Sequence, residues 1–200
     1  AKMPIVKTVL GKGYDVLLCT KDVDEFCFQS MMAYGPEPEL DADDKPIEGT
    51  GPKELKNVAS GDLDLASEEE KKEAEETAKE NETLFAAMKD ALGDAVTKVS
   101  VSSRLSDAPA CITAAGPVSL EMERIMAQMP DGAEGPKSER VLEINAKHPV
   151  FEVLKEAQAG GDADKVKLYA DILYNQALIV EGMPIDDPVA YANAVTKLMA

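Results

Sequence analysis

Near the C-terminal end of the chain, the residues from Asp162 to Val180 predict one long helix that is apolar around well over half of its circumference. Its apolar members are Val166, Leu168, Tyr169, Ala170, Ile172, Leu173, Ala177, Leu178, Ile179 and Val180. A helix that lies on the surface of a monomer needs only one apolar stripe. The predicted helix therefore has more apolar surface than packing on one side against a sheet would bury.

A second apolar helix follows, capped by Asp187 and opened by Pro188. Two such helices at a chain end predict a four-helix bundle between two copies across a two-fold axis, built by residues 163–181 and 188–200. The predicted interface residues are Leu173, Ala177, Val180, Tyr191, Ala194, Val195, Leu198 and Met199. The alternative is that both helices bury their apolar surface against the sheet of their own subunit.

The rest of the chain predicts a small sheet packed with helices, in α+β order. The expected strands are Ala95–Ser103, Ala110–Ala114 and Arg140–Asn145. The expected helices run from a capping box at Ser67 to about Leu92, from Gly116-Pro117 onward, and from Pro149 onward. A polar loop is expected over 131–138.

Upstream, the pattern predicts an α/β tail: a helix over 3–10, a strand over 14–20 and a helix over 22–34. Residues 36–54 are rich in Pro and acids and predict a loop, and 55–65 could add a short strand. We therefore expect two domains, 1–65 and 66–200. The abrupt start at Ala1 indicates a fragment of a longer protein.

Composition narrows the possible partners. The net charge is −17, which disfavours nucleic acid and anionic membrane surfaces because both need Lys and Arg contacts. No apolar stretch is long enough to span a bilayer. Aromatic residues make up only 4%, so packing must depend on aliphatic side chains and nine Met. That mixture favours helical packing over a β-sandwich.

The sequence offers little for catalysis or metal binding. The single His148 precedes Pro149, where a local capping role is favoured over catalysis. Cys19, Cys27 and Cys111 form no CxxC pair, which fits free thiols in a reducing, cytoplasmic compartment. No phosphate-binding loop is present. We therefore predict no enzyme activity, cofactor or metal in this fragment, with an acidic enzyme that uses a carboxylate pair as the alternative.

The helix expected after Pro117 carries an apolar stripe that includes three Met. Its members are Val118, Met122, Ile125, Met126 and Met129. Ordinary core packing is one interpretation of such a stripe. The other is a contact surface for many partners, because Met side chains are flexible and polarizable.

Several motifs, in a fixed order, resemble the ninety-kilodalton heat-shock protein chaperones, and the resemblance covers nearly the whole chain. The motifs are Val101–Cys111, Met122–Met126, Leu142–Asn145 with His148-Pro149, and Asp186–Pro188. Gly13–Leu18 and Asp24-Glu25 look like the end of the family's middle domain. Val118 stands where some eukaryotic members have Trp, and the family's acidic C-terminal pentapeptide is missing, so a bacterial type is expected.

The resemblance implies an α+β dimerisation domain whose last two helices form the bundle. It also implies that the stripe Val118, Met122, Ile125, Met126 and Met129 faces client proteins. The family's ATP site, with its magnesium, lies in an N-terminal domain that this chain lacks. The expected function is thus dimerisation and client contact in an ATP-dependent, cytoplasmic stress-response chaperone. Its expected partners are a second copy and unfolded client proteins.

Overall fold

The computed structural model describes residues 3–61, 63, 65–129 and 135–199. The chain forms two compact units, a larger one made of 1–16 with 59–200 and a smaller one made of 17–58. The mixed α+β class predicted from the sequence is confirmed. The predicted domain boundary near Leu65 stays a prediction about the full-length protein.

The smaller unit contains helix α2 (Asp22–Met31) and the antiparallel pair β1 (Ala33–Tyr34) and β2 (Lys53–Glu54). The strand predicted over 14–20 is wrong, because this stretch pairs with no other strand in the part of the chain that the structure describes. A strand is stable only when a neighbour accepts and donates its backbone hydrogen bonds. Of the strand expected over 55–65, the described residues form only a single bridge, between Ser60 and Ala114.

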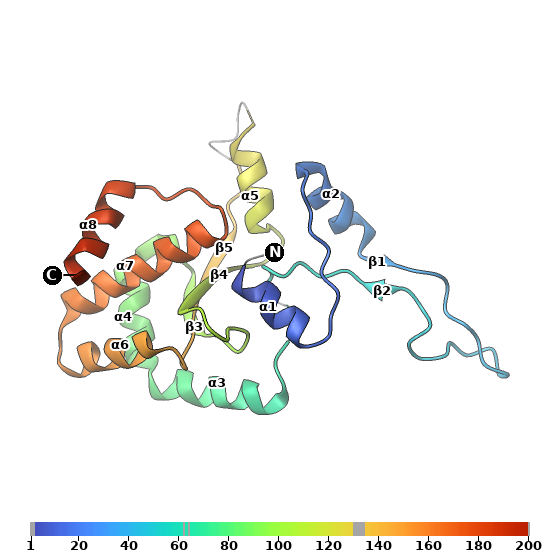
Figure 1. Cartoon of the computed structure of the whole chain (residues 1–200), viewed down its shortest axis with the longest axis horizontal. Coiled ribbons are helices and arrows are strands. Elements are labelled where there is room, and N and C mark those ends of the chain that lie inside the picture. Colours follow the sequence, from blue (N-terminus) through green and yellow to red (C-terminus); the bar gives the residue numbers. More distant parts are fainter. Residues whose placement is uncertain (1–2, 62, 64, 130–134, 200) are drawn as a thin grey trace. The chain divides into compact units, whose positions relative to one another are not determined.

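The larger unit holds the sheet and the remaining helices (Figure 1). Its helices are α1 (Pro4–Gly11), α3 (Glu68–Glu80), α4 (Glu82–Leu92), η1 (Gly93–Ala95), α5 (Leu120–Ala127), α6 (Pro149–Ala159), α7 (Ala163–Val180) and α8 (Pro188–Met199). Its strands are β3 (Lys98–Val101), β4 (Ala110–Ala115) and β5 (Glu139–Ile144). Strand β5 is central, parallel to β3 and antiparallel to β4.

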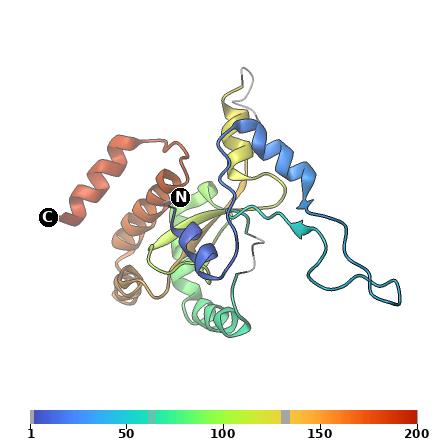
Figure 2. The same ribbon diagram turned by 45° about the vertical axis from the view of Figure 1, so that its right-hand side comes forward.

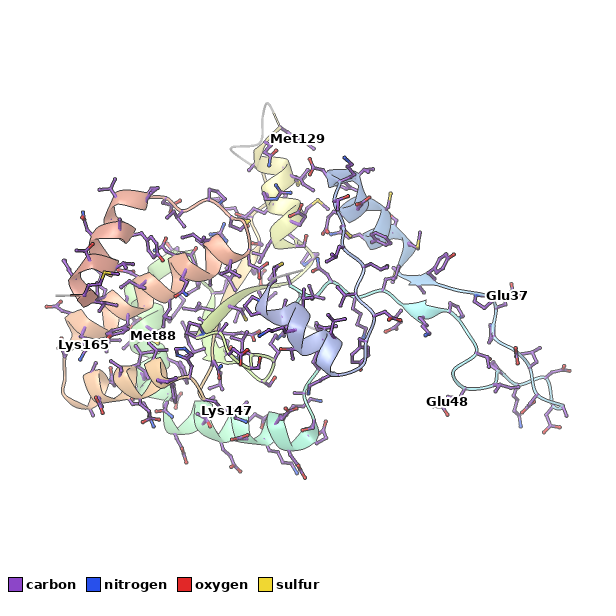
Figure 3. All side chains as sticks on the ribbon, in the orientation of Figure 1. Glu37, Glu48, Met88, Met129, Lys147 and Lys165 are labelled. Atoms are coloured by element: carbon purple, nitrogen blue, oxygen red, sulfur yellow. The ribbon has the colours of Figure 1, made fainter. Side chains whose placement is uncertain are left out.

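The two faces of this sheet differ in polarity. Leu142 and Ile144 of β5 face the apolar core, where α4 packs on β3 and α7 packs on β4. Met88 of α4 is fully buried in this core (Figure 3). Glu143, between those two strand residues, points to the opposite face and is buried among polar groups, as the two-residue period of a strand requires.

The helix predicted from Ser67 to Leu92 is in fact two helices. The capping box at its start is confirmed, because Ser67 Oγ accepts from Glu70 N and Glu70 Oε2 accepts from Ser67 N. The break lies at Asn81, whose side-chain amide donates to the carbonyl oxygen of Thr77. Asn favours such local bonds over a continuous helix, which explains the interruption.

The helix expected from Gly116-Pro117 begins later than predicted. Ser119 is the N-cap of α5, with its hydroxyl accepting from Met122 N at 2.9 Å, so Val118 lies before the helix. The caps predicted at two later helices are confirmed: His148 Nδ1 accepts from Val150 N, and Asp187 Oδ1 accepts from Ala190 N. Asp162, where the long helix was predicted to begin, is the N-cap of α7 and accepts from Lys165 N. The polar loop expected over 131–138 lies partly outside the described residues.

Candidate functional site

The predicted interface residues of α7 and α8 fall into two groups. Leu173 and Ala177 are each only 3% exposed and belong to the core of their own subunit, which corrects their predicted place on a free surface. Val180, at the end of the same helix, is 42% exposed. Helix α7 is therefore satisfied by its own subunit along most of its length, and only its C-terminal end offers apolar surface.

Helix α8 has the opposite character. It packs against α7 and lies at the edge of the larger unit (Figure 2). None of the residues described in Pro188–Met199 is buried. Leu198 is 42% exposed and Met199 is 80% exposed, while Tyr191, Ala194 and Val195 are half-buried. The apolar face predicted from the sequence is thus present and largely uncovered.

A groove with a volume of about 240 Å³ lies where α4, α7 and α8 meet. Tyr191 and Ala194 of α8 line it, opposite Tyr174 of α7 and Leu92 of α4. Asp171 also lines the groove, and burial raises the pKa of its carboxyl despite the opposing effect of Lys167. The groove is continuous with the apolar face of α8 and reaches from it to α7.

The Met-rich stripe of α5 is divided by burial. Met129, just beyond the end of the helix, is 49% exposed (Figure 3), and Val118, Met122 and Met126 are half-buried. Ile125 is 6% exposed, so it anchors the helix and is not available as a contact residue. The surface that α5 offers therefore consists of its Met side chains and Val118.

Glu123, on the same helix, fixes α5 to the start of β5. Its Oε1 accepts from Arg140 Nη2 at 2.7 Å, and its Oε2 accepts from the backbone N–H and the hydroxyl of Ser138. Arg140 also donates through Nη1 to the hydroxyl of Tyr174, at 2.7 Å. Tyr174 in turn donates to the carbonyl oxygen of Ala95 at 3.3 Å.

The electrostatics of this cluster keep both ions charged. Burial alone would raise the pKa of Glu123, but hydrogen bonds from Ser138 and the charge of Arg140 outweigh burial and lower it. Burial likewise acts to lower the pKa of Arg140, and Tyr174 and Glu123 outweigh it so that the pKa rises. The sequence analysis missed this cluster, because residues 17 and 34 positions apart give no local pattern.

A second buried ion pair lies on the polar face of the sheet. Arg104 Nε is 3.2 Å from Glu143 Oε2, and Arg104 also donates to the carbonyl oxygens of Ser60 and Gly61. Ser102 and Thr113 donate to the Glu143 carboxylate. This network holds the segment at 59–61 against β4, where Gly61 N donates to the carbonyl oxygen of Ala114.

The thiol of Cys111 lies beside this pair. Burial and then the negative charge of Glu143 raise its pKa well above the usual value. A thiol with a raised pKa is a poor nucleophile. Cys111 is therefore a poor candidate for a catalytic nucleophile.

Within 3–61, 63, 65–129 and 135–199, no group of three or more His, Cys, Asp or Glu side chains could hold a metal ion. Among the described helices, none combines the length and the apolar character needed to cross a membrane. The candidate sites are two contact surfaces, one on α5 and the other on α8 with the C-terminal end of α7.

Comparisons with known proteins agree on one family. The family model described as Hsp90 protein matches residues 1–200. The chain is 46% identical over 198 residues to the chaperone protein HtpG of a Clostridium perfringens strain, covering 99% of this chain and 28% of that relative. It is 43% identical to HtpG of Halalkalibacterium halodurans over 199 residues, which are 100% of this chain and 29% of the relative. For HtpG of Bacillus subtilis the identity is 40% over 198 residues, again 29% of the relative and 99% of this chain.

Proposed function

The chain belongs to the Hsp90 family, and from that premise we propose that it is the dimerisation and client-contact module of an ATP-dependent molecular chaperone. The family predicted from the sequence is confirmed, and the similar proteins are bacterial HtpG chaperones. The chain spans less than a third of the length of these relatives, 28% for the Clostridium perfringens protein. Nucleotide and magnesium are expected to bind elsewhere in the full-length protein, which we place in the cytoplasm.

The uncovered apolar face of α8 is the single observation that carries the dimerisation proposal. Leu198 and Met199 are exposed although α8 packs against α7, and Val180 extends the same kind of surface along α7. Exposed apolar surface of this kind favours contact with another protein. Stable interfaces usually bury more than about 1,000 Å² in total, and two helices from each subunit can supply that area.

A second copy of the chain is the partner that we assign to this face. A two-fold axis brings the same patch of each subunit together, so apolar α8 would meet apolar α8 without a separate complementary surface. The groove lined by Tyr191 and Ala194 provides a recess for side chains of the other subunit. The result would be the four-helix bundle predicted from the sequence.

Replacing Leu198 with Glu tests this assignment. An unpaired charge in an apolar interface is costly, so Leu198→Glu should sediment as a monomer while the wild-type chain sediments as a dimer. Asn193→Glu is the matched control, because it adds the same charge to α8 at an exposed position on the opposite side of the helix. A dimer that persists in Leu198→Glu would remove α8 from the interface.

The Met side chains of α5 carry the client-contact part of the proposal. Met122 and Met126 are half-buried, Met129 is exposed, and flexible thioethers suit a surface that meets many sequences. We expect Met122→Ala and Met126→Ala to weaken binding of an unfolded protein while the free energy of unfolding changes by about 1 kcal/mol or less.

Ile125→Ala shows how much stability is lost when a buried residue of the same helix is truncated, and the Met variants are compared with it. Ile125 lies on the same helix but is buried, so its truncation should cost roughly 2–5 kcal/mol of stability. If the two Met variants lost as much stability as Ile125→Ala, and lost binding only in proportion, the stripe would belong to the core. Dimerisation would then be the only part of the proposed function to survive.

A further inference from the structure

We propose that Glu123, Arg140 and Tyr174 form a bridge that couples client contact on α5 to dimer association through α7 and α8. This inference rests on the proposed function of both surfaces and concerns how one influences the other. The three side chains come from three different elements, α5, β5 and α7, and all of them lie in the larger unit. They are positioning residues: Glu123 and Arg140 lie outside both proposed contact surfaces, and Tyr174 reaches the groove beside α8.

The first link of the bridge joins α5 to β5. Glu123 accepts from Arg140 Nη2 at 2.7 Å, and the side chains of Glu123 and Arg140 are only 12% and 20% exposed. Removing one partner from such a shielded pair leaves the other charge without compensation, which is strongly unfavourable. Movement of α5 therefore either carries Arg140 along or breaks the pair.

The second link joins β5 to α7. The planar guanidinium of Arg140 uses one nitrogen for Glu123 and another for the Tyr174 hydroxyl, at 2.7 Å. A guanidinium is rigid, so its two bonds cannot adjust independently. A displacement of Glu123 is thus transmitted to the Tyr174 hydroxyl.

The third link reaches the proposed dimer interface. Tyr174 is buried in the core beside Leu173, and it also lines the groove where Tyr191 and Ala194 of α8 lie. Its hydroxyl is held a second time by the carbonyl oxygen of Ala95, at the end of η1. A displacement of Tyr174 would therefore change the shape of the groove and the packing of α8 against α7.

Coupling between two binding events is reciprocal: if a client changes the dimer dissociation constant, dimerisation changes client affinity by the same factor. The probe is reduced, carboxymethylated α-lactalbumin, a permanently unfolded protein, and the measured quantity is the dimer dissociation constant with and without saturating probe. For the wild-type chain we expect a change of at least about 5-fold. Tyr174→Phe, which removes only the bridging hydroxyl, should reduce that change to less than 2-fold.

Tyr169→Phe is the matched control, since it removes a hydroxyl from the same helix outside the bridge and should leave the coupling intact. Glu123→Gln breaks the other end, and the double variant with Tyr174→Phe should lose no more coupling than either single variant, because all three interrupt the same connection. A merely structural role would lower stability without removing the client-dependent change in dimer affinity.

Two results would overturn the inference while leaving the proposed function in place. One is a wild-type chain that dimerises and binds the probe with no mutual effect, and the other is full coupling in Tyr174→Phe. A wild-type chain that fails to dimerise or to bind the probe would instead overturn the proposed function itself, and the inference with it.

Discussion

Helices α7 and α8 follow one another in the chain and are both rich in apolar side chains, but they differ in what covers them. Helix α7 buries Val166, Ala170, Ile172, Leu173, Tyr174, Ala177 and Leu178. In α8, none of the residues described over Pro188–Met199 is buried. Helix α7 packs on α4, α6 and β4, whereas α8 packs mainly on α7.

This difference separates two uses of an apolar helix. The burial of α7 stabilises the fold of one subunit, at about 25 cal/mol for each Å² of apolar surface removed from water. The same driving force is still available on α8, since its apolar face remains exposed to water. Helix α7 is therefore core along most of its length, and α8 with the end of α7 is the surface that we propose for association.

Truncating one Leu in each helix should give the largest contrast. Leu173→Ala should lower the free energy of unfolding by roughly 2–5 kcal/mol at every protein concentration, because it leaves a cavity in the core of one subunit. Leu198→Ala should act on association, so its cost should vanish once the protein is diluted into monomers. Chemical unfolding over a range of protein concentrations measures both effects.

The contrast between the helices would fail if Leu198→Ala were as costly in the monomer as Leu173→Ala. That result would mean that α8 packs into its own subunit more tightly than its exposure indicates. The alternative weighed from the sequence, in which both terminal helices bury against their own sheet, would then hold for α8 as it already does for most of α7.

The sequence predicted local features well, because their causes are local. The caps at Ser67 and Asp187 follow from side chains that bond to nearby backbone N–H groups. Strand β5 was placed to within one residue at each end, since alternation across two faces is visible in the chain itself. The strand expected over 14–20 failed because a strand also depends on a distant partner.

The candidate sites show the same limit. Periodicity identified the apolar faces of α5, α7 and α8, but it could not say which of their residues the rest of the same chain covers. Leu173 and Ile125 follow the same pattern as Leu198 and Met129, and only the fold shows that the first two are buried. The bridge of Glu123, Arg140 and Tyr174 was not predictable, because it joins elements that are distant in sequence.

The end of α7, where the chain turns toward α8, should give a smaller, pH-dependent effect. Burial raises the pKa of Glu181 from 4.5 to about 7. The carboxyl of Glu181 binds its proton more tightly in the folded protein than in the unfolded chain, so protonation stabilises the fold. The free energy of unfolding should therefore fall as the pH rises from about 4.5 to about 7. Glu181→Gln mimics the protonated form and should remove this decline, gaining on the order of 2 kcal/mol at pH 8.

The exposed Glu75 of α3 provides the control, since Glu75→Gln removes one carboxyl without relieving a buried charge. Unfolding free energies measured between pH 4 and pH 8 should be parallel for the wild-type chain and Glu75→Gln, and flatter for Glu181→Gln. Parallel profiles for all three proteins would show that Glu181 is solvated in solution and that the end of α7 is open to water.

The smallest expected effect compares the N-caps of the two helices. Asp162 Oδ1 accepts from Lys165 N at 3.0 Å, and Asp187 Oδ1 accepts from Val189 N at 3.0 Å and from Ala190 N at 2.8 Å. Replacing either Asp with Ala should cost about 1 kcal/mol of helix stability.

Because α7 is built into the core, Asp162→Ala should lower the stability of the whole subunit by that amount. Because α8 is not, Asp187→Ala should leave subunit unfolding nearly unchanged, fray the first turn of α8 in hydrogen exchange, and weaken the dimer by less than about tenfold. Equal losses of subunit stability for both variants would show that α8 folds as one cooperative unit with the core, and the division between a core helix and an association helix would have to be given up.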